Sequence, residues 1–174
     1  MDQTERLAKE NELRRSHDEN LQQAQRFREY LDTSPVALSL VEGDSAGKRK
    51  VTYVNRAWEN LLGYSLEEMQ GESTKHLYLD EESFNLASST LNNAIDADKA
   101  WDFEIQQKRK DGSVFNARIQ GRYLVADDKI RGINFVQDLT TQQAYENALI
   151  EARDQAEAAT QAKSSFLANM SHEI

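Results

Sequence analysis

The sequence predicts an α+β domain that lies between two long helices. Two stretches rich in β-forming residues, 36–41 and 51–54, open the central segment and are followed by segments with helical spacing. Three further stretches between 101 and 138 alternate apolar with polar residues, as half-buried strands do. We divide the chain into an N-terminal helix or linker over 1–26, a domain over 27–139 and a C-terminal helix over 140–174.

The helices inside the domain carry their own start and stop signals. Asn55 can cap a helix over 56–62, and Gly63 can end that helix in the left-handed conformation. Residues 65–68 have the pattern of a capping box, which predicts a short second helix. Residues 83–97 repeat apolar side chains at helical spacing and predict a longer third helix.

Two turn signals, Lys110-Asp111-Gly112 and Asp127-Asp128, separate the last three strands, which should therefore be antiparallel. In the final strand Ile133 and Phe135 have one parity, whereas Ile130 and Val136 have the other. Both faces of the sheet should then be covered, one by helices and the other by the N-terminal helix or a second subunit. The alternative is that Phe135 is a singly exposed apolar residue.

The two terminal segments both read as helices in need of a partner. Residues 1–26 are almost entirely polar, and a lone helix of this kind is marginal in water. His17 belongs to its solvated face. In the C-terminal segment, apolar or small residues recur at spacings of four and three, interrupted only by Lys163: Tyr145, Leu149, Ala152, Ala156, Ala159, Phe166 and Met170. This heptad seam is typical of a coiled coil and places His172 at a c position, away from the seam.

Composition excludes several classes of function. The net charge of −9 and the pI of about 4.9 argue against binding to nucleic acid or anionic lipid. The absence of cysteine removes disulfides, thiolate metal sites and cysteine nucleophiles. No apolar run approaches the ~20 residues that cross a bilayer, and no signal peptide opens the chain. We expect a cytoplasmic segment without direct membrane insertion.

The last nine residues, F-L-A-N-M-S-H-E-I, follow Ala162-Lys163-Ser164-Ser165 and resemble the phosphoacceptor box of sensor histidine kinases, especially hybrid ones. The resemblance implies that His172 accepts the γ-phosphoryl group of ATP and that Glu173 assists removal of its proton. An imidazole with an ordinary pKa near ~6.5 is a usable nucleophile at neutral pH. That family's pattern continues beyond Ile174, so we expect the chain to be a piece of a longer protein.

The central segment resembles a PAS domain over roughly residues 27 to 140. The residues that carry this resemblance are V-T-Y-V-N-R-A-W-E-N-L-L-G-Y-S-L-E-E-M-Q-G at 51–71, K-R-K-D-G-S-V-F at 108–115 and D-L-T at 138–140. The resemblance implies a five-stranded antiparallel sheet with helices packed on one face. Such domains sense ligands, light, redox state or gas, or only dimerise.

The resemblance also marks the junction with the C-terminal helix, where Asp138-Leu139-Thr140 matches the family's D-I-T trigger with leucine for isoleucine. It implies that Asp138 holds the end of the strand by polar contacts. Thr140 to Gln143 has the pattern of a capping box, so the helix should begin at about 140 with Thr140 as its cap. A rigid helix would convert movement of the last strand into rotation or tilt.

No cofactor is predicted. Photosensors of the light-oxygen-voltage type need a cysteine for adduct chemistry, and the chain has none. We interpret His76, the only histidine of the core segment, as a loop residue rather than a ligand of haem or metal. The sequence leaves open whether the domain binds a small ligand. Core packing explains the aromatic residues equally well. The expected pocket lining is Trp58, Trp101, Tyr123, Asn134 and Val136.

These observations together predict a homodimeric sensory module of a two-component histidine kinase that controls phosphoryl transfer to His172. Its partners would be a downstream catalytic domain, which would supply ATP, and a response-regulator receiver domain. The 174 residues contain no Gly-rich phosphate loop, so the chain alone should not phosphorylate itself. The alternative is a dimerisation or partner-docking module that responds to no ligand. A haem protein is a third, weaker reading.

Overall fold

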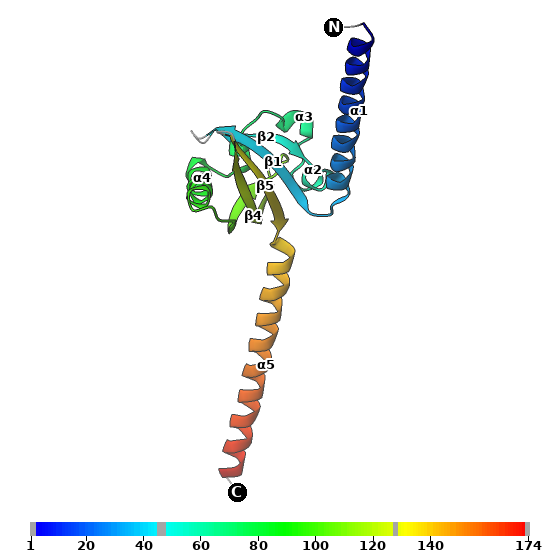
Figure 1. The fold of residues 1–174 in the computed structure, drawn as a ribbon. Helices are drawn as coiled ribbons and strands as arrows, with labels where there is room; N and C mark the ends of the chain where they lie inside the picture. The colour runs from blue at the N-terminus through cyan, green and yellow to red at the C-terminus, as the bar shows by residue number, and fades with distance from the viewer. Residues whose placement is uncertain (1–2, 45–47, 127–128, 173–174) are drawn as a thin grey trace.

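Five antiparallel strands form the centre of the structure, a computed structural model that describes residues 3–44, 48–126 and 129–172 (Figure 1). The strands are β1 (Ala37–Asp44), β2 (Arg49–Val54), β3 (Trp101–Lys108), β4 (Val114–Ala126) and β5 (Lys129–Asp138). Their order in the sheet is β2-β1-β5-β4-β3, so β5 is the central strand. The predicted α+β fold, a five-stranded antiparallel sheet with helices, is confirmed. The turn expected at Asp127 and Asp128 lies outside the described residues.

The register of the strands sorts their side chains onto two faces. Ser39 lies opposite Asn134, and Asn134 lies opposite Gly121, so all three belong to the inner face that the helices cover. Gly121 is required there because a Cβ atom would lie 2.4 Å from Cζ2 of Trp101 and 2.1 Å from the carbonyl oxygen of Ile133. Glycine thus lets an aromatic ring lie flat against the sheet.

Four short elements and their caps cover the inner face: α2 (Arg56–Leu62), α3 (Leu66–Met69), the 3₁₀ helix η1 (Thr74–Leu77) and α4 (Glu81–Asp96). The predicted cap at Asn55, the left-handed Gly63 with φ of 82° and the capping box of Ser65 and Glu68 are all present. Helix α4 begins two residues before the predicted position 83, because the side chain of Asp80 accepts the Ser83 amide and caps it.

The outer face of the sheet is only partly covered by this chain. In β5 burial alternates strictly, with Ile130 and Val136 buried and with Ile133 and Phe135 half-buried on the other side. The N-terminal helix reaches this face only at its C-terminal end, where the hydroxyl of Tyr53 lies 2.7 Å from Oδ1 of Asp32. The prediction that the N-terminal helix docks there therefore holds only for its C-terminal part, where the guanidinium of Arg28 also lies 6.0 Å from the centroid of the Tyr53 ring.

Two long helices, α1 (Gln3–Thr33) and α5 (Thr140–His172), leave the domain in opposite directions (Figure 1). Helix α1 continues seven residues past the predicted boundary at 26 and ends just before Ser34 and Pro35, because a residue that precedes proline disfavours the helical conformation. Most apolar side chains of both helices are exposed. Within the described residues, neither these helices nor the shorter ones combine the length and apolarity needed to cross a membrane.

Candidate functional site

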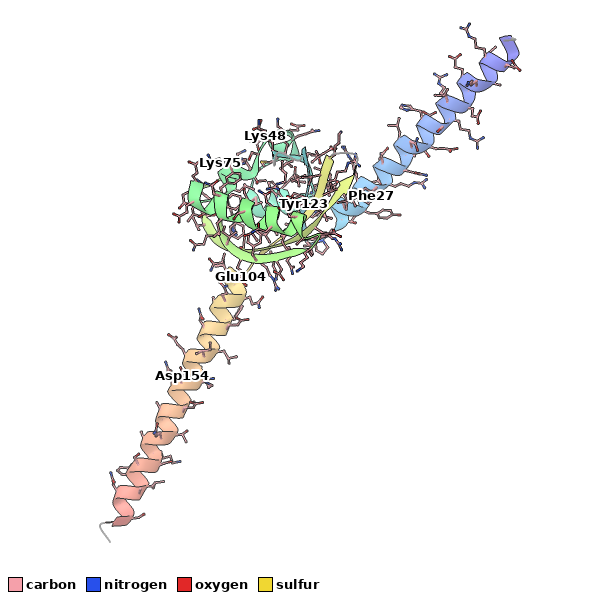
Figure 2. All side chains as sticks on the ribbon, turned by 60° about the vertical axis from the view of Figure 1, so that its left-hand side comes forward. Phe27, Lys48, Lys75, Glu104, Tyr123 and Asp154 are labelled. Atoms are coloured by element: carbon pink, nitrogen blue, oxygen red, sulfur yellow. The ribbon has the colours of Figure 1, made fainter. Side chains whose placement is uncertain are left out.

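A cavity of about 490 Å³ lies between the inner face of the sheet and the helices. Four of the five residues predicted to line a pocket do line it, namely Trp58, Tyr123, Asn134 and Val136. Trp101 does not. Its indole ring packs against the ring of Tyr123 with the centroids 4.5 Å apart, and so supports the wall from behind. Figure 2 places Tyr123 within the domain and Lys48, another residue of the lining, at its periphery.

Glycine again makes room for this wall. A Cβ atom on Gly132 of β5 would lie 2.0 Å from Cε1 of Tyr123, so the Tyr123 ring can cross the neighbouring strand only over a glycine. The position of this ring thus depends on a residue of the central strand, which leads into α5.

Sequence reasoning missed the polar part of the lining, in particular Ser39, Arg49, Tyr78 and Gln107. Gln107 is 3% exposed, and its Oε1 atom has no hydrogen-bond partner among the described residues. The alternation of β3 contained a signal for it, because Gln107 has the inward parity of Trp101, Phe103 and Ile105. A polar residue at an inward position was the clue.

The hydroxyl groups of two tyrosines in the cavity remain protonated at neutral pH. Burial raises the pKa of Tyr78 to about 12, although Arg49 and hydrogen bonds from the side chains of Gln107 and Thr74 act in the opposite direction. Burial likewise raises the pKa of Tyr123 to about 12, opposed by the positive charge of Arg49. Both hydroxyls are therefore neutral donors.

Arg49 connects the sheet to α4 beside these tyrosines. Its Nη1 atom donates to Oδ1 of Asn92 over 2.7 Å, and its guanidinium carbon lies 5.3 Å from the centroid of the Tyr123 ring. A guanidinium over an aromatic face is attracted by the ring quadrupole. Within the part of the chain that the structure describes, no carboxylate forms an ion pair with Arg49, so its charge is available to the cavity.

The predicted junction is a compact polar cluster around Asp138. One carboxylate oxygen, Oδ1, accepts the backbone N–H of Thr140 over 2.8 Å, and the other, Oδ2, lies 2.5 Å from Nη2 of Arg109. Although burial raises its pKa, the hydrogen bonds from Thr140 and the positive charge of Arg109 outweigh that effect and hold the pKa of Asp138 below its usual value. Leu139, which is 5% exposed, donates its N–H to the carbonyl oxygen of Asn116 over 2.8 Å.

The predicted roles at the start of α5 need one correction. Thr140 is the first residue of the helix rather than its cap, and the carboxylate of Asp138 satisfies the Thr140 N–H. Gln143 does not complete a capping box, since its Oε1 atom accepts from Nδ2 of Asn116 over 2.6 Å. Tertiary contact with β4 thus replaces the expected local contact, and it ties the first turn of α5 to the sheet.

Helix α5 is continuous from Thr140 to His172, so the junction and the predicted phosphoacceptor position belong to one element of 33 residues. At ~1.5 Å per residue it spans ~50 Å, and Figure 2 shows Asp154 well clear of the domain. The seam residues Tyr145, Leu149, Phe166 and Met170 are all exposed in the single chain. Glu173 lies outside the described residues.

His76 lies in η1, where its ring packs edge-on against Tyr64 at 4.8 Å between centroids and its Nε2 atom is 3.3 Å from Sδ of Met69. Burial lowers its pKa, which favours the neutral ring. Across residues 3–44, 48–126 and 129–172, no cluster of three histidine or acidic side chains is arranged to hold a metal ion.

Comparison with known proteins agrees with this architecture. Residues 36–141 match the PAS domain family, whereas no curated protein matches the chain. Among solved structures, a PAS domain from Colwellia psychrerythraea superposes with a TM-score of 0.58 at 19% identity, covering 68% of this chain and 98% of the other. A PAS domain from a two-component sensor histidine kinase gives 0.56 at 15% identity, with 68% and 98% covered.

A third similar structure is a PAS domain in complex with ethanol, from a transcriptional regulator in the LuxR family of Burkholderia thailandensis. Its TM-score is 0.56 at 18% identity, with 65% of this chain and 96% of the other covered. At these identities the solved structures support the fold alone. The family match, in contrast, spans more than half of the sequence and includes every strand. The chain therefore belongs to the PAS domain family.

Proposed function

We propose that this chain is the sensory module of a two-component histidine kinase and that it controls phosphoryl transfer to His172. The observation that carries the proposal is the uninterrupted helix from the sheet junction to His172. It joins a PAS domain to the F-L-A-N-M-S-H-E-I sequence. ATP would come from a catalytic domain elsewhere in the parent protein, and the module would work in the cytoplasm.

The central strand is the proposed route of the signal. Asn134 and Val136 of β5 line the cavity, and the same strand ends at Asp138, which binds both Arg109 and the first residue of α5. The Asn116–Gln143 bond fixes the first turn of α5 to β4. With no loop between strand and helix, a displacement of β5 has to rotate or tilt α5.

A parallel homodimer is part of this proposal. The exposed seam of α5, the exposed apolar residues of α1 and the half-buried Ile133 and Phe135 supply apolar area that a second copy would cover. The seam alone is weak, because it is rich in alanine and has Lys163 at an a position. The sheet face and α1 would have to contribute as well.

The direct test is phosphorylation of the full-length parent protein. His172→Gln should abolish the incorporation of acid-labile phosphate from ATP, because the nucleophile is removed. His17→Gln, on the exposed part of α1, is the matched control and should leave incorporation unchanged. Glu173→Gln should slow incorporation without abolishing it. Acid-labile phosphate that accumulates at the normal rate in His172→Gln would contradict the proposal.

A second candidate function is a dimerisation or docking module that responds to no ligand. The partly exposed outer face of the sheet favours it, since dimerisation alone would use that face. Measurement of ligand binding to the purified chain discriminates between the two functions.

A further inference from the structure

The cavity contains a buried polar atom that the protein itself leaves without a partner. Gln107 is almost fully buried at the end of β3 and lines the cavity, and its Oε1 atom lacks a donor among the described residues. The same side chain interacts with the hydroxyl of Tyr78. Buried acceptors without a donor are rare because loss of hydration destabilises them. A ligand that brings an N–H or O–H group would satisfy this oxygen.

The positive charge around the cavity favours a ligand that carries a negative charge. Lys48, Arg49 and Lys50 line it, against the single carboxylate of Glu72 among the lining residues. Arg49 is the best placed of the cations, because its guanidinium is held by Asn92 and by the Tyr123 ring. Held in this way, a guanidinium can bind a carboxylate through two parallel hydrogen bonds. The protonated hydroxyls of Tyr78 and Tyr123 add no opposing negative charge.

An apolar part of the wall combines two aromatic rings with aliphatic side chains. Trp58, Phe84, Leu91, Ile119 and Val136 contribute to it. The volume of about 490 Å³ is in the range of pockets that enclose small organic molecules, ~300–1,000 Å³. Flat rings of a ligand would pack against these side chains better than a flexible polar chain would.

We propose that the cavity binds a small aromatic carboxylic acid whose carboxylate pairs with Arg49 and whose opposite end donates a hydrogen bond to Oε1 of Gln107. This inference deepens the proposed sensory function and rests on it for its consequence, since a ligand here touches β5 at Asn134 and Val136. Binding itself is a property of the chain alone.

The test compares three probes by isothermal titration calorimetry on the purified chain. The first, 3-(4-hydroxyphenyl)propionate, has both the carboxylate and the donor. Its 4-methoxy analogue lacks the donor, and its primary amide lacks the charge. We expect each change to weaken binding about tenfold, the effect of one lost hydrogen bond or charge pair at a buried site. Because the change is made in the ligand, this comparison does not depend on the folding of any variant.

Variants then assign each preference to a residue. Gln107→Met keeps the volume of the side chain but removes the acceptor. The variant should bind the hydroxy and methoxy compounds equally, and its melting temperature should be no lower than that of the unsubstituted chain. Arg49→Gln should bind the acid and the amide equally. Arg131→Gln makes the same change of charge on β5, at a residue that faces away from the cavity, and should keep both preferences.

Three outcomes would overturn the inference. They are no binding of the hydroxy acid at millimolar concentration, equal binding of the acid and its amide, and equal binding of the hydroxy and methoxy compounds. None of them bears on His172, because the phosphorylation test uses the parent protein without added ligand. Conversely, normal phosphorylation of His172→Gln would remove the proposed function and leave the binding result intact.

Discussion

Asn55 joins three elements through one side chain. Its Oδ1 atom accepts the backbone N–H groups of Trp58 and Leu38, both at 3.0 Å, and its Nδ2 atom donates to the carbonyl oxygens of Leu31 and Val36. It is fully buried. The residue was predicted as a helix cap, yet the structure shows that it also fixes the end of α1 and the start of β1.

Asn55→Ala should therefore cost more than the loss of an ordinary cap. We expect the free energy of unfolding to fall by ~2–4 kcal/mol, because buried N–H and C=O groups lose their partner. Asp80→Ala, which removes the exposed cap of α4, is the comparison and should cost ~1 kcal/mol. Urea denaturation followed by circular dichroism measures both values. Equal losses in the two variants would contradict the special role of Asn55.

Asp138 makes stability depend on pH in a predictable direction. Its pKa is lowered in the folded chain, so its ionised form stabilises the fold above the unfolded pKa of ~3.9, and this contribution is lost as pH falls through the folded pKa. Asp138→Asn keeps an oxygen that can cap α5 but removes the charge that pairs with Arg109. The melting temperature of the variant should fall less than that of the parent between pH 5 and pH 2. Parallel curves over this range would exclude the effect.

Helix α5 is the element that the proposed signal has to cross. Its seam has a period of 3.5 residues and begins close to the fixed turn that Asn116 and Gln143 tie to the sheet. The angular position of His172 around the helix axis therefore depends on the number of residues between the junction and His172.

Insertions near Ala158 test this dependence in the full-length parent protein. One added residue rotates the distal part of the helix by ~100°, whereas seven residues nearly restore its phase. We expect the one-residue insertion to disturb or invert the regulation of phosphate incorporation. The seven-residue insertion should preserve it. Regulation that is equally lost, or equally kept, in both variants would exclude a rotating rigid helix.

The whole molecule leaves apolar surface uncovered on one side. Helices α2 to α4 cover the inner face of the sheet. Among the described residues, the C-terminal part of α1 contacts the outer face at Tyr53, and both long helices extend into solvent (Figure 1). A second copy of the chain could cover these surfaces together, and we expect a parallel homodimer at tens of micromolar.

Phe135→Glu should weaken this dimer, because it places a charge on the half-buried outer face. Leu86→Glu is the matched control, since Leu86 is an exposed apolar residue on α4, away from that face. Sedimentation equilibrium of the three proteins gives the dissociation constants. A monomeric unsubstituted chain, or equal weakening of the dimer by both substitutions, would count against the outer face as the contact.

Local sequence patterns were enough to predict the elements of the domain and several of their ends. Asn55, Gly63 and the pair Ser65–Glu68 were predictable because caps depend on residues at most four positions apart. The parity of the strands followed in the same way, since alternate side chains of a strand point to opposite faces. The family resemblance of the central segment was also contained in these local patterns.

Contacts between residues far apart in the sequence are set by the packing of the elements. Trp101 lies behind the cavity wall rather than in it, because Gly121, twenty residues along the chain, admits its ring. Gln143 binds Asn116 instead of the start of its own helix, so that capping falls to Asp138. Gln107, Tyr78 and Arg49 come together around one cavity from three separate segments. Such contacts depend on strand register and helix placement, which local spacing does not specify, and the chemistry of the cavity was for that reason visible only in the folded chain.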